Sequence, residues 1–356
     1  MTLKTSKKGL LSSGLPLEFD VSKIINELAP RKLIQDFSFI RKTDTGIEKD
    51  FSVDLAGTFL LGAILDKEET GSLSTQIDAE WSVLFECKHC RPGVRWIFLP
   101  SLNVRSPSDH HPCYTVVEEF SAVRLFSEKM RKLAALIYGG PGPHYIGPQI
   151  VREQLGDEIA LIPQCSKAFE LRDHDPNTSS PLEGIKQLQY GHVARIAEDL
   201  PSVMSGYLRG TSGRFSTIRV YSGVLVTTAH LHVLKRDINM TKIQDADGPS
   251  KIADEVECVE LQGPYSPDLL AFQRNKLMQL ERFGAQSEDI TPRQVSRAQD
   301  ALRKLSFRLE SNIPSLFVVT LGALKNFLEL QLKNQQKLTS SRMDIVLKEK
   351  SKLPST

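Results

Sequence analysis

The sequence predicts a mixed α/β or α+β protein built on one mixed sheet, and three patterns support this class. Segments 33–41 and 47–55 alternate between apolar and polar residues, which is typical of strands. The later segment 217–235 is dense in β-branched residues, as buried strands are. Segment 116–138 carries an apolar stripe at helical spacing. Because strand and helix patterns mix along the chain, we expect one sheet with helices packed on it.

The first elements expected are a short helix and a hairpin. Asp20 is a suitable helix cap, and Pro30 ends the helical pattern. Segments 33–41 and 47–55 follow, and the turn between them ends in Gly46. Two short strands around such a turn predict an antiparallel hairpin.

The next part of the chain is expected to be an insertion followed by two strands. Segment 57–78 contains a run of charged and small residues, and we interpret it as an insertion or long connection at the sheet margin. Segment 81–88 is then an apolar strand, and 91–93 (Arg-Pro-Gly) predicts a turn. Segment 94–99 continues as a bent or separate strand.

The remaining elements are mostly helical. The helix at 116–138 has the clearest pattern in the chain, and 182–200 is expected to be a second helix. Segment 313–320 has the composition of a buried strand and leads into a helix at 321–332.

These elements suggest an organisation into three parts. We expect an α/β domain over 1–240, with its core motifs in 20–140. A helix-rich part over 241–335 either extends this domain or completes it. The lysine-rich segment 336–356 is expected to be a flexible basic tail.

The composition is that of an ordinary globular protein. The 356 residues are 40% hydrophobic and 25% charged, and the formal net charge is +2, so any contact with nucleic acid requires a local basic patch. The five cysteines are scattered, which favours a reducing compartment. Because no segment has the pattern of a signal peptide or a membrane span, we expect a cytoplasmic protein without membrane contact.

Three charged residues lie where two expected strands end. Asp54 is near the end of the hairpin's second strand, and Glu86 and Lys88 end the strand at 81–88. Side chains alternate along a strand, so Glu86 and Lys88 share one face. Because half-burying a carboxylate and an ammonium is costly, we interpret the trio as a functional site.

The order of these features resembles the PD-(D/E)XK nuclease superfamily, whose restriction-endonuclease-like core is a helix, three strands, a helix and a further strand. The resemblance rests on Asp54, on Glu86-x-Lys88 and on the helix at 116–138. It departs from the family pattern at Val53, where the family often has proline, and in the 32 residues (86 minus 54) between the two acids. It implies a central mixed sheet flanked by helices.

The resemblance also implies a reaction and a metal site. Mg²⁺ prefers oxygen ligands, and Asp54 and Glu86 supply carboxylates. The family pattern adds the backbone carbonyl of Cys87 as a ligand and assigns to Lys88 the positioning of the attacking water. The expected activity is therefore hydrolysis of phosphodiester bonds with Mg²⁺ or Mn²⁺, in DNA rather than RNA.

The resemblance leaves the flanking contacts and the oligomeric state more open. Arg91 and Arg95 are candidates for holding flanking phosphates. A homodimer is compatible with the resemblance, because many enzymes of this fold dimerise to cut both strands.

Two other hypotheses stay open at the sequence level. The chain can be a nuclease-like fold without catalysis that binds nucleic acid or protein. Alternatively, a zinc ion stabilises an interaction protein through Cys87 and Cys90, completed by the segment 110–113 (His-His-Pro-Cys). Only one Cys-x-x-Cys pair is present, so Cys87 is expected to pack in the core instead.

Overall fold

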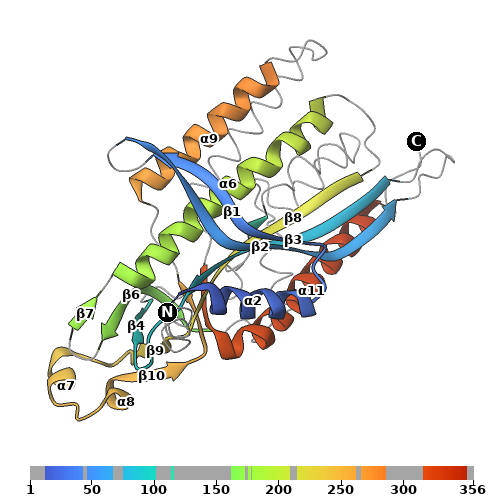
Figure 1. Cartoon of the computed structure of the whole chain (residues 1–356). Helices are drawn as coiled ribbons and strands as arrows, with labels where there is room; N and C mark the ends of the chain where they lie inside the picture. Colours follow the sequence, from blue (N-terminus) through green and yellow to red (C-terminus); the bar gives the residue numbers. More distant parts are fainter. Residues whose placement is uncertain are drawn as a thin grey trace, which may run out of the picture.

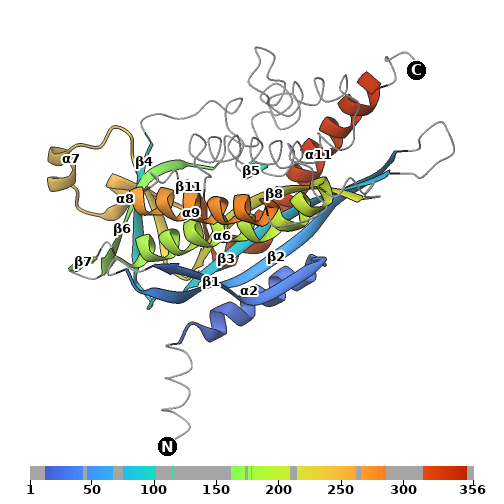
Figure 2. The same cartoon turned by 90° about the horizontal axis from the view of Figure 1, so that it is seen from above.

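A large mixed sheet with helices on both faces forms the body of the protein (Figures 1 and 2). The computed structural model describes residues 13–42, 46–66, 75–101, 114–115, 162–172, 175–177, 179–208, 215–261, 266–285 and 316–350. The expectation of a mixed α/β class with one mixed sheet is confirmed.

Within the described ranges, twelve strands make up the sheet. Their bounds are β1 Lys32–Lys42, β2 Glu48–Asp66, β3 Thr75–Lys88, β4 Arg95–Pro100, β5 Tyr114–Thr115, β6 Gln164–Arg172, β7 Asp175–Asn177, β8 Phe215–Thr227, β9 His230–Leu234, β10 Ala253–Val256, β11 Cys258–Leu261 and β12 Leu316–Thr320. The order across the sheet is β1-β2-β3-β8-β12-β11-β6-β4-β9-β10, with β5 beside β8 and β7 beside β6. β3, β8 and β12 run parallel to one another, while β2 is antiparallel to both of its neighbours.

The helices cover the two faces of the sheet. Their bounds are α2 Leu15–Glu27, α6 Ser179–Leu208, α7 Met240–Gln244, α8 Pro249–Ile252, α9 Pro267–Ala285, the 3₁₀ turn η2 Leu321–Ala323 and α11 Leu324–Lys350. α6 and α9 pack side by side on one face, and α2 and α11 cover the other (Figure 2).

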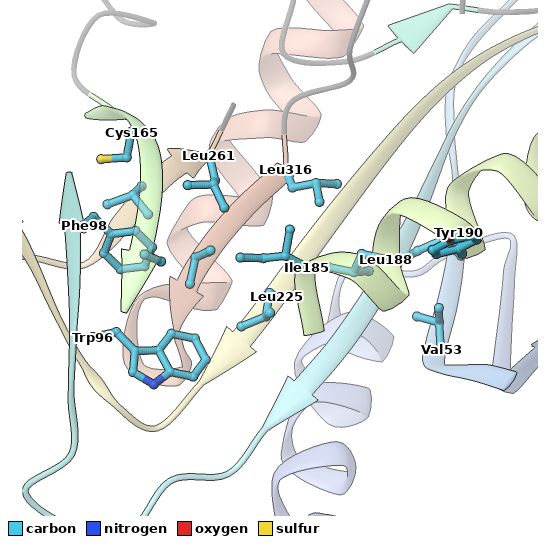
Figure 3. Packing of buried hydrophobic residues seen from close by; sticks show 14 of the residues in the cluster. Val53, Trp96, Phe98, Cys165, Ile185, Leu188, Tyr190, Leu225, Leu261 and Leu316 are labelled. Carbon is cyan, nitrogen blue, oxygen red and sulfur yellow. The ribbon is translucent and has the colours of Figure 1, made fainter. Parts of the chain in front are cut away.

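Each face of the sheet has its own apolar core. The core on the α6 side joins Ile185 and Leu188 of the helix to Leu225 of β8 and Leu316 of β12 (Figure 3). The core on the α2 and α11 side contains Trp81 and Phe85 of β3 together with residues of both helices. The side chains of β3 therefore alternate between two buried layers, which explains the uninterrupted apolar run at 83–85.

Several predicted elements are confirmed. β1 and β2 form the expected antiparallel hairpin, and 217–235 forms two strands, β8 and β9. Gly93 has a φ of +87° in the turn before β4, a conformation that glycine adopts without a steric penalty.

The expected insertion at 57–78 is wrong for most of its length. β2 continues to Asp66, β3 begins at Thr75, and the two strands pair continuously except for an irregularity between Leu60 and Gly62. These residues form one long hairpin because their apolar side chains pack in the core on the α2 and α11 side. Charged and small residues at the outer end made the segment resemble a loop.

The helices also differ from the expected bounds. α2 begins at Leu15 instead of Asp20, since Pro16 suits a first helical turn and Leu17, Val21 and Ile25 form a buried stripe. α11 runs to Lys350, so 336–350 is helical and not an irregular tail. The predicted helix at 116–138 lies outside the described residues.

The expected C-terminal part shares the same sheet. β11 and β12 lie between β8 and β6 in the strand order, so they complete the sheet to which β3 belongs. Segment 241–335 is therefore joined to the part that carries Asp54, Glu86 and Lys88.

Candidate active site

The predicted charged trio lies at the end of the β2–β3 pair. The pairing of the two strands ends at Leu55 and Phe85, so Asp54 and Glu86 are the next residue on each strand. Oδ2 of Asp54 accepts a hydrogen bond of 2.6 Å from the backbone N–H of Cys87. The Asp54 carboxylate thus takes the place of a backbone carbonyl where the strands separate.

A local distortion of the β1–β2 hairpin causes this separation. Asp36 has a φ of +53°. The pairs Gln35–Leu55 and Phe37–Val53 are formed on either side of it, but Asp36 itself is not paired. On β2, Val53 packs in the core on the α6 side, whereas Leu55 packs in the core on the α2 side. Residues that are two positions apart on a regular strand share a face, so the alternation is broken between these two residues. Asp36 and Asp54 therefore lie where the two faces of the hairpin exchange.

Glu86 and Lys88 form a close ion pair at the end of β3. Nζ of Lys88 is 2.6 Å from Oε1 of Glu86, and the Glu86 side chain is 5% exposed. The other oxygen, Oε2, is buried and has no hydrogen-bond partner among the described residues. An unpartnered buried carboxylate oxygen is costly unless something binds to it.

The electrostatics of the site follow from burial and from mutual repulsion of acids. Burial, and then the charge of Asp54, raise the pKa of Glu86 to about 7. Burial also raises the pKa of Asp54, although the Cys87 N–H and Lys88 oppose this shift. Burial alone would lower the pKa of Lys88, but the ion pair with Glu86 outweighs it and the net pKa is raised. The lysine is therefore charged, while Glu86 changes its protonation close to neutral pH.

Two further acids belong to the same electrostatic cluster. The pKa of Glu18 on α2 is raised by burial and by the charges of Asp54 and Asp36, and Lys88 opposes the shift. Sequence reasoning missed Glu18 and Asp36. Asp36 would have been found by aligning the hairpin register, which brings it beside Asp54.

Helix α6 holds Lys88 from the other side. A Cβ on Gly184 would lie 3.1 Å from Cε of Lys88, so the absence of a side chain lets the lysine stem pass against the helix. The helix runs away from the site, since Gly191 approaches Leu84 and Arg195 donates to Ser82. The amino-terminal half of α6, with its partial positive charge, therefore lies nearest to the end of β3.

The remaining predicted residues lie around this centre. The Cys87 side chain packs in the core on the α2 side, where burial strongly raises the pKa of its thiol, and the role of its carbonyl as a metal ligand stays a prediction. Arg91 is exposed in the turn after β3. Arg95 is partly buried at the start of β4. Burial lowers the pKa of His232, and the hydrogen bond with His230 lowers the pKa of Glu255; the charge of Arg95 adds to both shifts.

The zinc interpretation is not supported by the described residues. Cys87 and Cys90 pack in cores on opposite faces of the sheet, so their thiols do not converge on one ion. Among the residues that the structure describes, no group of three or more His, Cys, Asp and Glu side chains is arranged to hold a metal. Segment 110–113 lies outside those residues.

The carboxylates fit a magnesium ion better than a zinc ion. Mg²⁺ is usually held by one or two carboxylates together with water and substrate phosphate, so a preformed cage of three protein ligands is not required. Oε2 of Glu86 is an unpartnered acceptor, and Asp54 uses only Oδ2 in its hydrogen bond to Cys87. The residues present are compatible with a hard divalent cation.

Comparisons of the chain with protein-family models, with curated proteins and with solved structures find no match. Within the part of the chain that the structure describes, no helix combines the length and the apolar character needed to cross a membrane.

Proposed function

We propose that this protein is a metal-dependent nuclease of the PD-(D/E)XK type that hydrolyses phosphodiester bonds, with DNA as the expected substrate. The observation that carries the proposal is the Glu86–Lys88 pair beside Asp54, in which Oε2 of Glu86 is buried without a partner. Such an oxygen is explained by a cation or a reacting water that completes the site.

The order of the elements supports the proposal. α2, β1, β2 and β3 give a helix and three strands, and α6 followed by β8 gives a helix and a further strand parallel to β3. α6 packs against β3 and β8, so it occupies the position that the sequence assigned to 116–138. This order supports our proposal of a restriction-endonuclease-like core.

The proposed chemistry assigns a role to each residue. Asp54 and Glu86 would hold Mg²⁺ or Mn²⁺, with the Cys87 carbonyl as the further ligand. The bound ion supplies Lewis-acid polarisation of the phosphate and a lowered pKa of its water. The Lys88 ammonium orients the attacking water and offsets the charge that develops on the phosphorane. Because a proton competes for Glu86 near neutral pH, we expect activity to rise as pH increases through 7.

A cleavage assay with matched variants tests the proposal. Plasmid DNA, linear DNA and RNA are incubated with Mg²⁺ or Mn²⁺ and with wild type, Glu86→Gln or Lys88→Ala. The control is the ion pair between Lys325 and Glu27, which has the same residue types at 2.7 Å but is exposed and joins α11 to α2. We expect a loss of about 10²–10³-fold in rate for the site variants and wild-type rates for Lys325→Ala. Equal cleavage, or equal lack of cleavage, by all four proteins contradicts the catalytic role.

One observation favours a second candidate function. Asp54 already caps the N–H of Cys87, and Glu86 is already paired with Lys88, so part of this network also suits a nuclease-like module that only binds nucleic acid or protein. Tight DNA binding without cleavage, unchanged by Lys88→Ala, would select this alternative.

A further inference from the structure

A pocket of about 720 Å³ opens next to the candidate site, where the sheet bends. It lies at the carboxyl ends of β8 and β12, and its wall continues through the segment 228–230 into β9. The loop between β10 and β11 and the start of η2 form the other walls. Its volume is within the range of about 300–1,000 Å³ typical of small-molecule sites.

One wall of the pocket is fixed to the backbone of the candidate catalytic lysine. Thr227 pairs with Lys88 across the β3–β8 ladder, and its Oγ1 donates to the Lys88 carbonyl at 2.9 Å. The N–H of Thr228 approaches the same carbonyl at 3.4 Å. An occupant of this pocket would therefore be a close neighbour of a phosphate bound at Lys88.

Two carboxylates stand among the polar side chains of the pocket, whose other polar members are threonine hydroxyls and His230. Glu255 and Glu257 both line it and are exposed. Oε1 of Glu255 is 2.9 Å from Nδ1 of His230, whereas no hydrogen bond or ion pair of the Glu257 side chain occurs within the described residues. Two carboxylates repel a phosphate but accept hydrogen bonds from amino groups.

The other lining residues give the pocket partly apolar walls. Val256, Leu321 and the methyl-bearing threonines of β8 and β12 contribute to it. Walls of this kind suit the faces of a planar ring, whose edge then meets the carboxylates. Among the parts of a nucleic acid, the bases have this combination of flat apolar faces and a donor edge.

We propose that this pocket holds a nucleobase of the substrate strand beside the scissile phosphate and selects bases that carry an exocyclic amino group. Adenine, cytosine and guanine present such a donor to Glu257, and thymine does not. This inference rests on the proposed function, since it takes the ligand to be a nucleic acid held at Lys88. It adds a specificity element that the trio itself does not provide.

The experiment measures binding separately from cleavage. Fluorescent single-stranded oligonucleotides dA12, dC12 and dT12 are titrated with Glu86→Gln protein, alone and combined with Glu257→Ala, because a glutamine would keep an acceptor oxygen. The matched control is Glu48→Ala, another exposed glutamate at the start of β2. A good contact to a base edge discriminates by about 1–3 kcal/mol, so we expect dA12 and dC12 to bind about tenfold more tightly than dT12. The Glu257→Ala change should reduce this ratio to about one, while Glu48→Ala leaves it intact.

Two outcomes overturn the proposal: equal binding of the three oligonucleotides, or a preference that survives both Glu257→Ala and Glu255→Ala. The results also separate this inference from the proposed function. If the wild type cleaves DNA and no base preference exists, only the pocket assignment fails. If the base preference depends on Glu257 but the wild type does not cleave, the nuclease assignment fails and the pocket stands.

Discussion

The raised pKa of Glu86 predicts a specific pH dependence of stability. In the folded protein this pKa is about 7, against an ordinary value of 4.5. Between these values the unfolded chain has lost the proton that the folded protein keeps, so the free energy of unfolding falls as pH rises from 4.5 to 7. At about 1.4 kcal/mol per pH unit, the full loss is about 3 kcal/mol. Glu86→Gln removes this loss because the amide does not ionise.

The assay is urea unfolding followed by the fluorescence of Trp81 and Trp96, which are both fully buried. Between pH 5 and pH 8, wild type should lose about 2–3 kcal/mol more stability than Glu86→Gln. The difference between two pH values is informative because the unpaired Lys88 of the variant affects both measurements. The exposed control Glu48→Gln should follow the wild-type profile. Profiles of wild type and Glu86→Gln that run parallel to within ~0.5 kcal/mol would refute the assigned burial of this carboxyl.

Three other predictions concern the surroundings of the site. A Cβ on Gly184 would lie 2.5 Å from Cδ1 of the buried Leu225. Gly184→Val should therefore lower the free energy of unfolding by about 1–3 kcal/mol and slow cleavage. Gly248→Ala is the control: its Cβ would meet no described atom within 4 Å, so it should leave the free energy of unfolding unchanged in the same urea assay. His192 is fully buried, neither of its ring nitrogens has a partner in the part of the chain that the structure describes, and burial lowers its pKa to about 4. Because the unfolded chain takes up this proton below 6.5, stability falls as pH drops toward 4, and His192→Phe should gain about 2 kcal/mol at pH 5 relative to pH 8. Glu18→Gln removes a charge that raises the pKa of Glu86, so the acidic limb of the activity profile should move to lower pH; an unchanged limb would separate Glu18 from the site.

The parts of the fold that could be predicted depend on local patterns. The β1–β2 hairpin and the β8–β9 segment follow from alternation and β-branched content within a few residues, and both are confirmed. The sequence also placed Asp54 and Glu86 at the ends of strands, which holds for Glu86 near the end of β3 but not for Asp54, because β2 continues to Asp66. In the structure they are the next residues beyond the last pair of the β2–β3 ladder.

The parts that were missed depend on contacts distant in sequence. Segment 57–66 is a strand because it packs under α2 and pairs with β3. The charged residues that follow it in the sequence made a connection the more obvious prediction. Glu18 joins the cluster only through the packing of α2 on the sheet, which no period in the sequence encodes. Asp36 lies between the pairs Gln35–Leu55 and Phe37–Val53, as Asp54 does, so it can be found only once the register of the hairpin is known.

The pairing of β3 on both edges has a consequence for the dynamics of the protein. β2 covers one edge of this strand up to Phe85, and β8 covers the other edge as far as Lys88. Amide hydrogens on a strand that is paired on both edges and buried on both faces exchange with solvent only through the largest openings of a protein. The amides of 81–85 should thus be among the slowest to exchange, so Glu86 and Lys88 directly follow a segment that opens only when the sheet itself opens.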